Sequence, residues 1–218
     1  MHTLVSISFS PVYALPLMVM MALAGRCLAG RVRRFLAKTT APGQPSHPAI
    51  TGGIWLYGIT TTFFLLSSAP FLCRLSAVLM ASFMLQMALT DAISGYLPAT
   101  FTRRFLAAGL LMSLATGILP VRVAETLVTG ILLLILHVLV NRKRERVGAG
   151  DLWLMAGLTA WTGLNSTFWS LLAGYGGFVI WHATWHLRGQ REGPLGPWLC
   201  LGSLLMLLNN LYQPLWVI

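Results

Sequence analysis

The chain contains only two aspartates, Asp91 and Asp151, and each borders an apolar stretch. Asp91 follows the apolar residues 75–90, and Asp151 precedes the apolar residues 152–164. A carboxylate at membrane depth costs about 2.5–3.5 kcal/mol or more, so a residue of this kind is expected to have a function. Two carboxylates in one site indicate aspartyl chemistry, in which the ionised group activates a water and the protonated group hydrogen-bonds the scissile carbonyl. Such chemistry requires no metal and no cofactor.

The helix ends that these residues mark predict different roles for the two carboxylates. Asp151 is expected at a helix N-terminus, where the helix dipole favours its anion, and Asp91 near a C-terminus, where the dipole disfavours it. We therefore predict Asp151 as the base and Asp91 as the acid. Gly148 and Gly150, just before Asp151, are expected to let the backbone turn sharply and approach a substrate.

Each aspartate also has a structural interpretation when it is taken alone. Asp151 after a glycine turn is typical of a helix N-cap, and Asp91 is typical of an interfacial charge that ends a helix. Their occurrence as the chain's only aspartates favours the shared site.

The composition is that of a polytopic membrane protein. Of the 218 residues, 56% are hydrophobic and 9% are charged, whereas soluble domains carry about 25% charged residues. The net charge of +10 comes from basic residues in short clusters between apolar runs. That pattern indicates membrane topology and excludes a nucleic-acid-binding surface. We predict a single all-α, membrane-embedded domain over residues 1–218.

Eight apolar runs predict about eight transmembrane helices, since a spanning helix needs roughly 20 residues. The first run is expected to be retained instead of removed as a signal peptide, because its basic residues follow it. The runs are 11–29, 53–72, 75–90, 105–119, 123–140, 152–164, 167–187 and 197–216.

The distribution of basic residues predicts the orientation of these helices. With the N-terminus outside, all but Arg74 and Arg122 of the 15 lysines and arginines fall on the cytoplasmic side, as the positive-inside rule requires. The same alternation places Asp91 and Asp151 on the cytoplasmic side. The longest loop, at about 30–52, is rich in proline and glycine and is expected to be a short flexible cytoplasmic linker.

Three segments give the chain a resemblance to a known family. They are Thr90-Asp91 with Leu97-Pro98, then Gly148-Ala149-Gly150-Asp151, then Gly193-Pro194-Leu195-Gly196-Pro197-Trp198-Leu199. In this order and spacing they resemble the type IV prepilin leader peptidases, which are GxGD intramembrane aspartyl proteases. The likeness covers residues 75–205 well.

The resemblance implies an intramembrane aspartyl endopeptidase of the bacterial inner membrane. It would remove the basic leader of type IV prepilins or pseudopilins after a glycine, at the cytoplasmic face, with Asp91 and Asp151 as the catalytic residues. Its partners would be the pilin substrate and membrane lipids. Large members also carry an N-methyltransferase domain with paired CxxC motifs. Here the corresponding loop is short and the cysteines form no CxxC pair, so we expect the short form, without methyltransferase activity.

Two other functions remain open at this level. A proton-coupled transporter would use the carboxylates to load protons, although the chain shows no two similar halves. A non-catalytic scaffold of a pilus or secretion assembly would not require both aspartates. The sequence does not indicate an oligomeric state.

Overall fold

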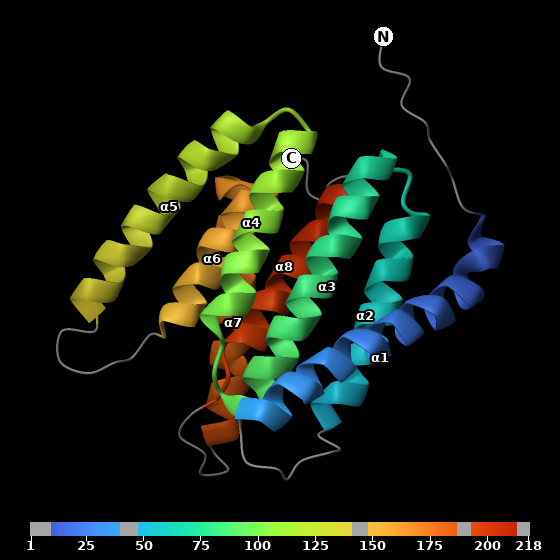
Figure 1. Cartoon of the computed structure of the whole chain (residues 1–218), viewed down its shortest axis with the longest axis horizontal. Helices are drawn as coiled ribbons and strands as arrows, with labels where there is room; N and C mark the ends of the chain where they lie inside the picture. The colour runs from blue at the N-terminus through green and yellow to red at the C-terminus, as the bar shows by residue number, and fades with distance from the viewer. Residues whose placement is uncertain (1–9, 40–47, 141–147, 187–192, 213–218) are drawn as a thin grey trace. The chain divides into compact units, whose positions relative to one another are not determined.

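The computed structural model describes residues 10–39, 48–140, 148–186 and 193–212. Within these ranges the chain forms one short 3-10 turn, Pro11–Tyr13, and eight α-helices, with no strand, so the all-α prediction is confirmed (Figure 1). The helices are α1 (Ala14–Thr39), α2 (Pro48–Leu66), α3 (Phe71–Ser94), α4 (Ala99–Ala115), α5 (Leu119–Val140), α6 (Ala149–Thr162), α7 (Leu164–His186) and α8 (Gly196–Tyr212).

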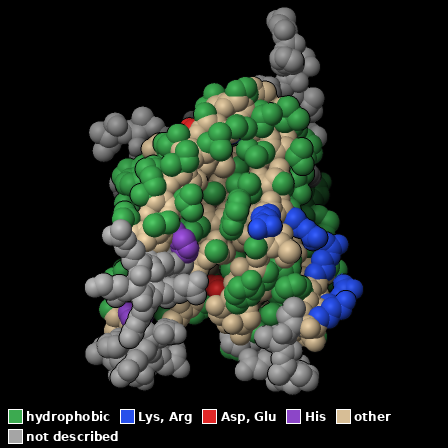
Figure 2. Space-filling view, turned by 60° about the vertical axis from the view of Figure 1, so that its left-hand side comes forward, with side chains coloured by type: hydrophobic (Ala, Val, Ile, Leu, Met, Phe, Trp, Pro, Cys, Tyr) green, Lys and Arg blue, Asp and Glu red, His purple; other side chains and the backbone are tan. Residues whose placement is uncertain are grey.

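Four of the described helices, α1, α2, α3 and α5, are long and apolar enough to cross a membrane. The prediction of about eight spans is therefore supported only in part. The 14 residues of α6, for example, extend about 21 Å, less than the roughly 30 Å of a bilayer core. Hydrophobic side chains are spread over much of the face seen in Figure 2, as expected for a membrane protein.

The linker predicted over 30–52 is shorter in the structure, because both of its ends are helical. α1 continues to Thr39 and α2 already begins at Pro48. Val32 and Leu36, one helical turn apart, are both buried, so the basic end of α1 is amphipathic and packs as a helix. Pro48 fits the first position of α2, where its missing N–H has no helical partner.

The chain divides into two compact units. One comprises residues 1–94 and 204–218, and the other comprises residues 95–203. Their placement relative to each other is not determined.

The first unit is held together by close contacts among α1, α2 and α3. A Cβ on Gly25 of α1 would lie 3.0 Å from the Tyr57 ring of α2, and one on Gly58 would lie 3.3 Å from Ala22. The Tyr57 hydroxyl also forms a 2.8 Å hydrogen bond with Ser82 of α3. Small residues bring these helices close together, and such packing replaces the hydrophobic effect inside a membrane.

Arg74, near the start of α3, is one of the largest fully buried side chains, with 2% exposure. Its guanidinium donates to the carbonyl oxygen of Leu65 at 3.0 Å. Leu65 lies in the last turn of α2, where backbone carbonyls have no helical partner. The buried arginine therefore closes the turn between α2 and α3.

In the second unit, α6 packs between α4 and α5 (Figure 1). A Cβ on Gly109 of α4 would lie 2.7 Å from the Trp161 ring, and the Trp161 indole donates to the Phe105 carbonyl at 2.9 Å. Ser113 of α4 donates to the Ala160 carbonyl of α6 at 3.0 Å. These contacts fix α6, which carries Asp151.

The end of α6 depends on Gly163, whose φ of 84° and ψ of 169° lie in a region open almost only to glycine. A Cβ on Gly163 would also collide with the guanidinium of Arg122. That guanidinium forms a 2.7 Å ion pair with Glu125 on α5. Backbone geometry and packing thus both require glycine here.

We expect Gly163→Ala to destabilise the protein by about 2–4 kcal/mol, because it adds backbone strain and displaces Arg122. Thermal unfolding of the purified protein in detergent measures this. Gly130→Ala on α5 is the matched control, since its Cβ would meet nothing within 4 Å and alanine favours a helix. Equal melting temperatures for the two variants would contradict the assignment.

Candidate active site

Asp91 lies in the last turn of α3 and belongs to the first unit. Its exposed fraction is 5%, and its neighbour Thr90 is fully buried. Gly95, with a φ of 64°, follows the helix and ends it, as glycine does at many helix C-termini. The carboxylate therefore lies at the C-terminal end of a candidate membrane span, as the sequence predicts.

Gln86, about one turn before Asp91, could have oriented the carboxylate. Its side-chain amide instead donates to the Ser82 carbonyl of its own helix at 3.1 Å. The Thr90 hydroxyl likewise donates to the Gln86 carbonyl at 2.6 Å. Both hydrogen bonds therefore join a polar side chain of α3 to a backbone carbonyl of the same helix.

Asp151 is the third residue of α6 and belongs to the second unit. The N-cap is Gly148, with φ of −70° and ψ of 144°, and the Asp151 N–H donates to the Gly148 carbonyl at 3.2 Å. Asp151 is therefore not the N-cap residue, and that interpretation is wrong. Its place in the first turn still favours the carboxylate anion through the helix dipole.

The two glycines before Asp151 have different roles. Among the described residues the glycines with positive φ are Gly95, Gly117 and Gly163, so neither Gly148 nor Gly150 adopts a conformation that only glycine reaches easily. Gly150 is needed for close packing instead.

The close approach at Gly150 is to the backbone of Leu97. A Cβ on Gly150 would collide with the Leu97 carbonyl oxygen and would lie 2.9 Å from the Leu97 Cβ. Leu97 and Pro98 are both buried. Parts of the first two family-like segments, separated by about 50 residues in sequence, thus meet inside one unit.

The third family-like segment packs the start of α8 against α7. A Cβ on Gly174 would lie 2.9 Å from the Trp198 carbonyl oxygen, and one on Gly177 would lie 2.7 Å from the Trp198 ring. These two glycines of α7 therefore form a close-packing face. Leu199 is fully buried in the same region.

The structure adds Tyr175 of α7 to the neighbourhood of Asp151. Its hydroxyl lies 4.0 Å from the Met155 sulfur, one turn after Asp151 on α6, and the Asp151 carboxylate interacts with it electrostatically. The sequence carried no signal for Tyr175, which lies within a glycine-rich packing segment. Only the helix pairing identifies it.

Arg103 of α4 is a second group near the start of α6. Its guanidinium carbon lies 5.5 Å from the centre of the Trp153 ring, within the range of a cation–π contact. Trp153 stands two residues after Asp151. Arg103 of α4 thus places a positive charge beside Trp153 of α6.

Comparison with known proteins relates the chain to one family. The pattern of the type IV leader peptidase family matches residues 78–183, which include both aspartates. A prepilin leader peptidase/N-methyltransferase of Dickeya chrysanthemi is 32% identical over 149 residues, which cover 65% of this chain and 53% of that protein. The chain thus spans about half the length of this curated relative. No solved structure matches the chain. Residues 78–183 thus resemble the type IV leader peptidase family.

Proposed function

We propose that this chain is an intramembrane aspartyl endopeptidase that removes the leader of type IV prepilins or pseudopilins. Cleavage follows a glycine at the cytoplasmic face of the bacterial inner membrane, with Asp91 and Asp151 as the catalytic pair. The observation that carries the proposal is that the family match includes both aspartates of the chain. The tight packing of Gly150 on Leu97 supports the same site.

In the proposed mechanism Asp151 is the ionised base, as its position at the N-terminus of α6 favours. It takes a proton from a water, whose oxygen attacks the scissile carbonyl carbon, while protonated Asp91 donates its proton to the carbonyl oxygen. The tetrahedral intermediate then collapses as the C–N bond breaks. The proton now on Asp151 passes to the leaving amine, and the hydroxyl proton of the intermediate returns to Asp91.

The test is a cleavage assay with the full chain. We would co-express it with a candidate prepilin and read leader removal by gel shift and N-terminal sequencing. Cleavage after the leader glycine supports the proposal. Absence of cleavage with well-expressed protein, across several pilins, would contradict it and favour the scaffold or transporter.

We expect the mature pilin from this assay to carry an unmethylated N-terminus. The three cysteines, Cys27, Cys73 and Cys200, form no CxxC pair. Intact mass of the product measures methylation, since each methyl group adds about 14 Da. Comparison with the mass of the synthetic unmethylated N-terminal peptide provides the control. A product heavier by one methyl group, in a host lacking other prepilin peptidases, would contradict this expectation.

A further inference from the structure

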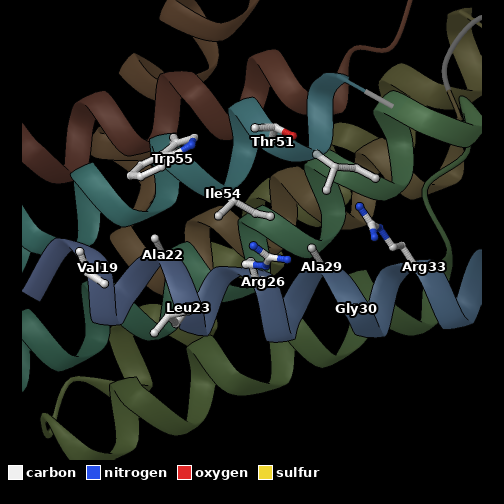
Figure 3. Close-up of a pocket in the computed structure, with 11 residues that line it drawn as sticks. Val19, Ala22, Leu23, Arg26, Ala29, Gly30, Arg33, Thr51, Ile54 and Trp55 are labelled. Atoms are coloured by element: carbon white, nitrogen blue, oxygen red, sulfur yellow. The ribbon is translucent and has the colours of Figure 1, made fainter. Parts of the chain in front are cut away.

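A pocket of about 510 Å³ lies between α1 and α2, entirely within the first unit. It is far in sequence from both aspartates, and the proposed peptidase chemistry does not use it. Figure 3 shows the Arg26 and Arg33 side chains directed from α1 toward α2. The residues that matter for its chemistry are Val19, Leu23, Arg26, Gly30, Arg33 and Trp55.

The polar part of the pocket is formed by two arginines. Arg26 and Arg33 lie two helical turns apart on the same face of α1, with a rise of roughly 10 Å between them. Across the described residues the recorded ion pair is Arg122–Glu125, so neither arginine has a carboxylate partner there. Cationic side chains within a candidate span favour compensation by an anion.

The apolar part of the pocket lies along the same helices. Val19, Leu23 and Trp55 are 52%, 58% and 50% exposed, and they lie on helices long and apolar enough to cross a membrane. Along α1 the pocket thus changes from apolar near Val19 to cationic near Arg33. Gly30 lies between the two arginines, and a Cβ there would meet nothing within 4 Å.

We propose that this pocket binds one anionic phospholipid. The headgroup phosphate lies between the guanidinium groups of Arg26 and Arg33, which suit phosphate oxygens as paired donors. An acyl chain runs along Val19, Leu23 and Trp55. A free phosphate would leave this apolar surface unused, and a basic peptide would be repelled by the two arginines.

Charge variants test the proposal by native mass spectrometry. The detergent-purified chain is titrated with phosphatidylglycerol and with phosphatidylcholine of the same acyl chains. The Arg26→Gln/Arg33→Gln variant should bind phosphatidylglycerol about 25-fold more weakly, since each arginine near an anionic lipid strengthens binding about fivefold. Arg31→Gln/Arg34→Gln is the matched control, because it removes two exposed arginines of α1 outside the pocket and should keep the wild-type preference. Equal losses in both variants would overturn the proposal.

A second variant tests the pocket without changing charge. Gly30→Leu should fill the space and release the lipid, whereas Gly52→Leu on α2 should not, since its Cβ also meets nothing within 4 Å but the residue does not line the pocket. Lipid binding unchanged by Gly30→Leu would overturn the proposal. Displacement of the lipid by inorganic phosphate alone would show an anion site without lipid selectivity, and displacement by a prepilin peptide would assign the pocket to substrate. These readouts do not depend on peptidase activity.

Discussion

Replacing either aspartate with asparagine is expected to lower prepilin cleavage about a thousandfold or more, because each carboxylate carries a proton transfer that an amide cannot perform. The Asp91→Asn/Asp151→Asn variant should be no slower than either single variant, since residues that act as a unit lose their effect together. Initial rates of leader removal from a purified prepilin in detergent measure this.

The control for this experiment is Gln86→Ala. Gln86 lies about one turn before Asp91, but its side-chain amide donates to the Ser82 carbonyl of its own helix, so cleavage should stay within about threefold of wild type. Each aspartate variant should also unfold at the wild-type temperature. A single asparagine variant that cleaves at the wild-type rate would remove that aspartate from the mechanism.

Gly150→Ala is expected to lower cleavage about a hundredfold, because the added methyl group would collide with the Leu97 backbone. Relief of that collision shifts the first turn of α6, which carries Asp151. A displacement of about 1 Å at a catalytic group costs on the order of a hundredfold in rate. The kcat and KM of leader cleavage, measured separately, should show a loss mainly in kcat.

The matched control is Gly148→Ala, two residues away. Gly148 has a φ of −70° that alanine adopts freely, and the nearest atom to an added Cβ is an Asp151 carboxylate oxygen at 3.7 Å. Cleavage by this variant should therefore remain near the wild-type rate. Equal losses at Gly148 and Gly150 would show that backbone freedom, and not contact with Leu97, is what the motif requires.

Much of the fold could be predicted from the sequence, because apolar runs in a membrane protein leave little choice of secondary structure. The run 152–164, although short, is recovered as α6. The linker was overestimated because the charged residues 31–38 were grouped with the proline- and glycine-rich segment that follows them. Burial of Val32 and Leu36 on the opposite face was not visible in a count of charges.

The part of the site that depends on tertiary contacts could not be predicted. The roles of Gly150 and Tyr175 follow from which helices pack together, and a single sequence does not contain that information. The positions of Asp91 and Asp151 at a helix C-terminus and a helix N-terminus depend on local signals, and both predictions are confirmed. Their approach to each other and their roles as acid and base remain predictions.

Arg74 and Arg122 are the two basic residues that do not follow the positive-inside distribution. Arg74 donates to a helix-end carbonyl and Arg122 pairs with Glu125. Each arginine therefore stabilises its own unit. Replacing either one is expected to lower the stability of the fold more than it alters membrane insertion. When distant relatives are compared, a charged residue at the position of Arg74 or Arg122 should be judged by the groups that it contacts. The side of the membrane on which it is predicted to lie is less informative.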